Sequence, residues 1–92
     1  MLLAIDAGNT NTVIGLYEGA TMLRPWRLAT QSERTSDELA LLVTQFLAQH
    51  DIEFDEHIEG VVVSSGVPRV TSALREMIMR YAPQARLVVL EP

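Results

Sequence analysis

Apolar and polar positions follow one another along this chain in a pattern that predicts strands first and helices later. Three mainly apolar stretches, 2–5, 13–17 and 22–29, are short and are separated by turns that contain Gly and Asn, as is typical of β-strands. Pro25 interrupts the third stretch and cannot donate a ladder hydrogen bond, so we expect that strand to lie at a sheet edge or to bulge there. The first 29 residues therefore predict an antiparallel meander of three strands.

A helix is predicted over 36–49. Thr35 followed three residues later by Glu38 is a capping box, and Asp37 adds a second acidic residue to the first turn. Apolar residues then recur at helical spacing on one face, which we expect to pack on the core. These residues are Leu39, Leu42, Val43, Phe46 and Leu47.

The second half of the chain predicts strand, helix, strand. Gly60–Ser65 contains three consecutive valines without polar alternation, and 2–5 is likewise continuously apolar, so we expect both strands to be covered on both faces. Pro68 suits the first turn of a helix that stops at Ala82-Pro83, and 87–90 is the last strand. The stripe expected to be buried on this helix is Val70, Leu74, Met77, Ile78 and Tyr81.

The segment 50–59 between the predicted helix and the valine strand is acidic, and we expect it to be a solvated loop. It contains both histidines, His50 and His57. Their seven-residue spacing does not place two ligands on one helical face, which argues against a metal site here.

The resulting order is β-β-β-α-β-α-β, an α/β fold with a mixed five-stranded sheet. Right-handed crossovers make the later strands parallel to the first one. This layout resembles a ribonuclease H-like lobe. The 92 residues form one domain, 1–92, since single domains run from about 50 to 250 residues.

The stretch from Asp6 to Thr12, between the first two strands, has the composition of a phosphate-binding turn. A carboxylate at the end of a buried strand must be paired, hydrogen-bonded or metal-bound, and Asp6 takes that position. Residues 8–11 offer backbone N–H groups, two amides and a hydroxyl within one bend, which suits phosphate oxygens. The ligand that this pattern favours is a nucleoside triphosphate with its metal.

A plain hairpin is the alternative interpretation of the same residues. Gly-Asn pairs are common in hairpin turns because they accept positive φ, and most such turns bind nothing. A plain hairpin needs only about two loop residues, whereas positions 6–11 are all polar or small. Both interpretations stay open on this pattern alone.

Charge and composition narrow the classes of function. The formal net charge is −5 and all seven cations are arginine, so the lysine that a P-loop or a protein kinase requires is missing. The negative charge argues against a nucleic-acid partner. An acidic protein that grips phosphate without lysine would neutralise it with a divalent metal and backbone dipoles. The absence of cysteine, of a membrane span and of a signal peptide predicts a cytoplasmic protein without a membrane partner.

Two further motifs have simpler explanations. Ser64-Ser65-Gly66 lacks the first glycine of a hydrolase nucleophile elbow, so we interpret the serines as polar groups at the ligand side of the sheet. A general acid–base pair of Asp6 with Asp37 or Glu38 is not needed, because the helix start accounts for the latter two.

Three segments resemble type III pantothenate kinase, a family of the sugar kinase, heat-shock chaperone and actin superfamily. The likeness spans nearly the whole chain, and Gly66 departs from it, since the family more often has valine there. The segments are Asp6-Ala7-Gly8-Asn9-Thr10, Arg27-Leu28-Ala29-Thr30 with Arg34-Thr35-Ser36-Asp37-Glu38, and Val62-Val63-Ser64-Ser65-Gly66-Val67-Pro68.

The resemblance implies ATP-dependent phosphorylation of pantothenate to 4'-phosphopantothenate, the first step of coenzyme A biosynthesis. It implies Mg2+ bound by Asp6 through water, a monovalent cation (K+ or NH4+) and a homodimer. The cofactor-binding residues would be Asp6, Ala7, Gly8, Asn9, Thr10, Asn11, Thr12 and Val13.

The resemblance covers only an amino-terminal lobe, because family members are much longer. Their catalytic base lies in a Gly-x-Asp-Arg segment downstream of the position of Pro92, so no catalytic residue is assigned within this chain. We therefore expect a fragment that is inactive alone. Two alternatives remain: an acetate or sugar kinase of the same superfamily, which the second and third segments oppose, and a truncated, non-catalytic homologue that acts as a nucleotide-binding or accessory regulatory protein.

Overall fold

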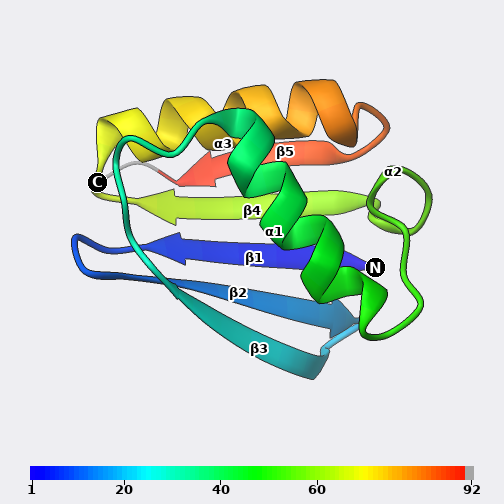
Figure 1. Ribbon diagram of the computed structural model, residues 1–92. Coiled ribbons are helices and arrows are strands. Elements are labelled where there is room, and N and C mark those ends of the chain that lie inside the picture. Colours follow the sequence, from blue (N-terminus) through cyan, green and yellow to red (C-terminus); the bar gives the residue numbers. More distant parts are fainter. Residues whose placement is uncertain (91–92) are drawn as a thin grey trace.

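The computed structural model describes residues 1–90 and shows the predicted order of elements, with one short helix added (Figure 1). Among residues 1–90, no helix is long and apolar enough to cross a membrane. The strands are β1 (Leu2–Ala7), β2 (Asn11–Glu18), β3 (Thr21–Ala29), β4 (Gly60–Ser65) and β5 (Arg86–Leu90), and the helices are α1 (Ser36–Ala48), α2 (Phe54–His57) and α3 (Pro68–Tyr81).

The five strands form one mixed sheet in the order β3-β2-β1-β4-β5. β2 is antiparallel to both β1 and β3, whereas β4 is parallel to both β1 and β5. This confirms the predicted mixed five-stranded sheet, and β3, which contains Pro25, lies at its edge as expected. Because β1 and β4 are parallel, their carboxyl ends meet at one edge of the sheet.

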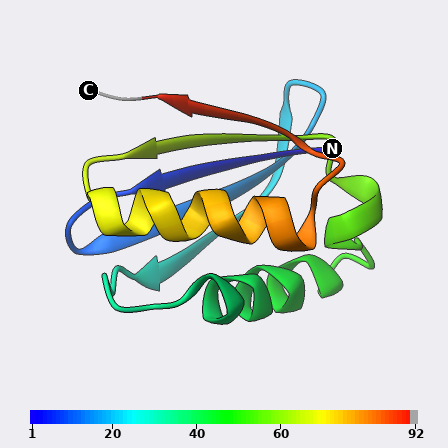
Figure 2. The same cartoon turned by 90° about the horizontal axis from the view of Figure 1, so that it is seen from above.

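All three helices lie on the same side of the sheet (Figure 2). Along β1 the residues Leu3 and Ile5 are buried, whereas Leu2 is exposed and Ala4 is half-buried. The predicted coverage of 2–5 and Gly60–Ser65 on both faces is therefore wrong, because an apolar run does not reveal on which side helices pack. The uncovered side is called the open face here. The residues on it include Leu2, Ala4, Asp6, Val13, Gly15, Tyr17, Val62, Ser64, Val88 and Leu90.

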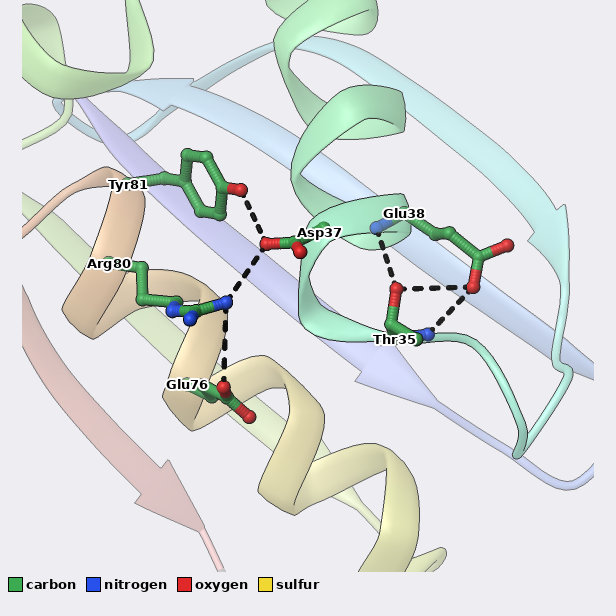
Figure 3. Close-up of polar contacts among 6 residues, drawn as sticks. All are labelled: Thr35, Asp37, Glu38, Glu76, Arg80 and Tyr81. Atoms are coloured by element: carbon green, nitrogen blue, oxygen red, sulfur yellow. Dashed lines mark hydrogen bonds and ion pairs between the residues drawn. The ribbon is translucent and has the colours of Figure 1, made fainter.

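The start of α1 is the predicted capping box (Figure 3). The Thr35 Oγ1 accepts a hydrogen bond from the Glu38 N–H at 3.1 Å, and the Glu38 carboxylate accepts one from the Thr35 N–H at 3.0 Å. The helix then buries the residues that its spacing predicted, apart from Leu42 and Phe46, which are half-buried. Its buried apolar residues are Leu39, Ala40, Val43 and Leu47.

The predicted stripe of α3 is correct except at its last residue. Val70, Leu74, Met77 and Ile78 are buried, but Tyr81 is 39% exposed. Its phenol donates a hydrogen bond to the Asp37 carboxylate on α1 instead of entering the core (Figure 3). A tyrosine at a helix end can keep its polar tip in water while its ring covers a neighbour.

The segment 50–59 is not the solvated loop that its acidic composition predicted. Ile52, Phe54 and Ile58 are buried, and α2 forms around Phe54. The Gln84 side-chain amide fixes the segment by donating to the carbonyl oxygens of Phe54 at 3.0 Å and Ile58 at 2.9 Å. Three apolar side chains at irregular spacing thus anchor a stretch whose polar residues face solvent.

Candidate functional site

The turn between β1 and β2 is tighter than the sequence predicted. β1 continues through Asp6 and Ala7, and β2 starts at Asn11, so only residues 8–10 connect the strands. The Gly8 N–H donates to the Asn11 carbonyl at 2.9 Å and closes the turn. The expected polar loop from Asp6 to Thr12 is therefore wrong in extent, and with it the argument that a hairpin would need fewer loop residues.

The tip of this turn still presents unengaged polar groups. All four residues from Gly8 to Asn11 are exposed. Within the described chain, the N–H groups of Asn9 and Thr10 take part in no hydrogen bond, and neither do the side chains of residues 9–11. Two N–H groups, two amides and one hydroxyl thus face solvent together, which is a donor set for phosphate oxygens.

Asp6 lies on the open face of the sheet, one residue before the end of β1. Its side chain is exposed, so the premise that it is a buried carboxylate in need of a partner is wrong. By register its neighbours are Val13 on β2 and Ser64 on β4, and its carboxylate makes no hydrogen bond or ion pair with residues 1–90. A carboxylate without a protein partner is available to a hydrated cation.

The remaining candidate binding residues divide between the two faces. Val13 is half-buried on the open face beside Asp6. Ala7 and Thr12 are buried on the helix-covered face, at 1% and 5% exposure, and Thr12 shares a hydrogen bond with Thr30. The side chains of Ala7 and Thr12 therefore face the core, away from Asp6.

The end of β4 lies beside this turn. The Gly66 N–H donates to the Ala7 carbonyl at 3.3 Å, which joins the bend after β4 to the end of β1. The Ser65 Oγ accepts from the Val67 N–H at 3.1 Å and so belongs to the start of α3. Ser64 is exposed on the open face next to Asp6. The two serines thus lie at the strand end as expected, Ser64 beside Asp6 on the open face and Ser65 beside Ala7.

Asp37 and Glu38 form contacts of their own at the start of α1 (Figure 3). The Arg80 guanidinium lies 3.1 Å from the Asp37 carboxylate, and the Tyr81 phenol donates to the same oxygen. That hydrogen bond raises the pKa of Tyr81, because the donor is lost on ionisation. Hydrogen bonds from the Thr35 N–H and hydroxyl lower the pKa of Glu38. These contacts agree with the prediction from the sequence that both residues belong to the start of the helix.

The comparison with protein families is decisive. A model of type III pantothenate kinase matches residues 2–92. This chain belongs to the type III pantothenate kinase family.

Curated relatives of the family align over the whole chain. The type III pantothenate kinase of Streptomyces griseus subsp. griseus is 41% identical over 95 residues, covering 100% of this chain and 36% of the relative. Those of Syntrophotalea carbinolica and Acidothermus cellulolyticus are each 46% identical, covering 97% and 100% of this chain and 34% and 35% of the relatives. The chain thus spans about a third of the length of these relatives.

Solved structures confirm the predicted ribonuclease H-like fold. A putative N-acetylglucosamine kinase from Porphyromonas gingivalis superimposes with a TM-score of 0.67 at 17% identity, covering 99% of this chain and 34% of that protein. RuvC from T. thermophilus, solved with a Holliday junction substrate, gives a TM-score of 0.61 at 17% identity, covering 99% and 65%. At this identity the likeness concerns the fold alone.

The sequence analysis did not predict two features of the site. The first is Ser64 as the neighbour of Asp6, which follows from strand register and from no motif. The second is the burial of the Thr12 hydroxyl against Thr30. The alternation of β2 could have revealed it, since Thr12 shares its parity with Ile14 and Leu16, whose apolar side chains are buried.

Proposed function

We propose that this chain is the phosphate-binding lobe of a type III pantothenate kinase, which phosphorylates pantothenate with ATP to give 4'-phosphopantothenate, the first step towards coenzyme A. The observation that carries the proposal is the family match over residues 2–92. The exposed turn supports it, because its unengaged donors and the unpaired Asp6 carboxylate fall on the residues that resemble the family's first phosphate loop.

The residues present fit a magnesium ion and a polyphosphate. Mg2+ prefers oxygen ligands and keeps several waters, so one exposed carboxylate such as Asp6 can hold it through water. The N–H groups of Asn9 and Thr10, with the side chains of residues 9–11, would contact phosphate oxygens. When bound, the metal neutralises charge on the phosphates. The other residues of the proposed site, Ala7, Thr12 and Val13, would support the turn from the strands.

The part of this lobe in the reaction is positioning. Phosphoryl transfer needs little covalent chemistry from the protein, and its rate depends on alignment and charge neutralisation. We assign no catalytic base within 1–90 and expect it in a Gly-x-Asp-Arg segment of the full-length gene product. Pantothenate as a second substrate, K+ or NH4+ as a monovalent cofactor, a homodimer and a cytoplasmic location belong to the proposal on family grounds.

The test is an assay of the full-length gene product with ATP and Mg2+, offering pantothenate, acetate and sugars as separate acceptors. We expect 4'-phosphopantothenate and no transfer to the other acceptors. Transfer to acetate or a sugar alone would assign the chain to another kinase of the superfamily. Nucleotide binding without transfer to any acceptor would identify a non-catalytic homologue, and either result would overturn the proposal.

A further inference from the structure

Thr30 is bonded to the candidate phosphate-binding turn at two points. Its N–H donates to the Thr10 carbonyl at 2.9 Å, and its hydroxyl oxygen lies 2.8 Å from that of Thr12. Asn11 is paired with Ala29 across β2 and β3, so Thr10 and Thr30 are the next opposed pair beyond the ends of both strands. The two bonds therefore extend the β2–β3 ladder into the tip of the turn.

The hydroxyl bond lies on the helix-covered face. Thr12 is 5% exposed and Thr30 is half-buried, and as diagonal cross-strand neighbours they point to the same side of the sheet. A buried hydroxyl without a partner is costly, so the Thr12 hydroxyl needs that of Thr30. Neither hydroxyl faces the side of Asp6, so neither would contact a ligand held there.

The backbone bond acts next to the groups that would meet phosphate. Because a peptide unit is planar, fixing the Thr10 carbonyl oxygen restrains the plane of the 10–11 peptide. That peptide adjoins the 9–10 peptide, which carries the unengaged Thr10 N–H. Exposed turns otherwise move on the nanosecond to microsecond scale, and a donor set that moves must be ordered when it binds.

We propose that Thr30 is a positioning residue, which holds the tip of the turn in the orientation that binds a metal-bound polyphosphate. The inference rests on the proposed function, since it assigns Thr30 to the same site. Thr30 acts through Thr10 and Thr12 and does not touch the ligand. Its loss is expected to weaken binding of magnesium and ATP without changing the binding of pantothenate.

The first test compares Thr30→Val with Thr30→Ser in the full-length gene product. Valine keeps the shape and the backbone N–H but removes the hydroxyl, whereas serine keeps the hydroxyl. We expect Thr30→Val to raise the KM and the dissociation constant for magnesium-ATP about tenfold, the equivalent of one hydrogen bond, with the KM for pantothenate unchanged and Thr30→Ser close to wild type. Thr44→Val, the same chemical change at an exposed position of α1, is the control and should change neither constant.

The double variant Thr12→Val/Thr30→Val separates positioning from stability. Replacing both partners leaves no unsatisfied hydroxyl, so the melting temperature should recover relative to Thr30→Val alone. We expect the weakened magnesium-ATP binding to persist, together with faster hydrogen exchange at the amides of residues 9–11. A residue that serves stability alone would let binding recover with the melting temperature.

The outcomes separate this inference from the proposed function. If the wild type phosphorylates pantothenate and both Thr30→Val and the double variant bind magnesium-ATP as the wild type does, the inference is overturned and the proposed function stands. If the wild type neither binds magnesium-ATP nor phosphorylates pantothenate, the proposed function fails and the inference with it. If Thr30→Val does not fold, the double variant decides by the same criterion.

Discussion

The backbone conformation at position 8 does not require a glycine. Gly19 is the only described glycine with a positive φ, at 60°, and a Cβ built on Gly8 would meet just the Asn11 carbonyl oxygen, at 3.4 Å. The fold can therefore accept a side chain at Gly8. Without a side chain at Gly8, a ligand can come close to the backbone of this exposed turn. Phosphate-binding turns use glycine in the same way.

We expect Gly8→Ala in the full-length gene product to keep the melting temperature within a few degrees of wild type and to weaken magnesium-ATP binding several-fold. The methyl group would keep phosphate oxygens from the turn. Gly66→Ala is the matched control, because a Cβ there meets nothing within 4 Å. Calorimetric titration measures the binding, and equal affinity of both variants would contradict the assigned use of Gly8.

At the scale of elements, the capping box of α1 ties stability to the protonation of one carboxylate. We expect Thr35→Ala to lower the free energy of unfolding by about 1 kcal/mol.

The pKa of Glu38 is lowered from its ordinary 4.5 in the folded state, so the stability that its carboxylate adds is present above that pH and is lost as the pH falls through the folded pKa. The stability difference between wild type and Glu38→Gln, measured by urea denaturation, should therefore be present at neutral pH and shrink in acid. A difference that is the same at both pH values would contradict this assignment.

The contact of Tyr81 with Asp37 joins the end of α3 to the start of α1 (Figure 3). This bond keeps Tyr81 protonated above its ordinary pKa of 10.0, so the stability that it adds is present below that pH and is lost as the pH rises through the folded pKa. We expect ultraviolet titration to show a raised tyrosine pKa that Asp37→Asn returns towards 10.0 and Tyr81→Phe removes. A tyrosine titration that Asp37→Asn leaves unchanged would refute the contact.

Apart from α2, the elements of this chain were predictable, and the sides on which they pack were not. Local patterns decide a strand, a cap or a helix stop, as the capping box at Thr35 and the stop at Ala82-Pro83 illustrate. Whether Asp6 is buried depends on where α1 and α3 pack, which no local pattern encodes. The same holds for Phe54, buried within an acidic segment, and for Tyr81, whose ring continues an apolar stripe while its hydroxyl finds Asp37.

In the candidate site, likewise, local patterns predict residue types, whereas the assembled sheet decides which residues are neighbours. The residue types of the turn favour a phosphate ligand, because donors and a carboxylate follow one another in the sequence, but they also allow a plain hairpin. The partner of Thr12 and the neighbour of Asp6 come from other parts of the chain, 18 residues away in the first case. Register alone brings Ser64 beside Asp6, and register is a property of the assembled sheet.

At the scale of the whole molecule, the open face of the sheet leaves apolar residues in contact with water. Leu2, Val88 and Leu90 are 36%, 44% and 54% exposed, on β1 and β5. Exposed apolar surface of this kind marks a face that packs against another body. The helix-covered face, by contrast, carries the core of the lobe.

We therefore expect the 92-residue polypeptide alone to self-associate as its concentration rises, measured by analytical ultracentrifugation. Val88→Lys should shift it towards monomer, because it places a charge on the open face. Met79→Lys is the control, since Met79 is 73% exposed on α3, on the other side of the sheet. A monomer at all concentrations, or equal effects of the two substitutions, would show that the open face does not drive association.

We propose that the turn after β1 receives a metal-bound polyphosphate and that Asp6 holds the metal. The most direct measurement follows the amide resonances of residues 8–11 in the full-length gene product during titration with magnesium-ATP. We expect these resonances to shift in the wild type and in the control Asp51→Asn, which makes the same charge change at a residue with φ of 58° that asparagine tolerates. Asp6→Asn should abolish most of the shift and leave the fold intact. Binding with the turn resonances unmoved, or an Asp6→Asn variant that binds as the wild type does, would contradict the claim.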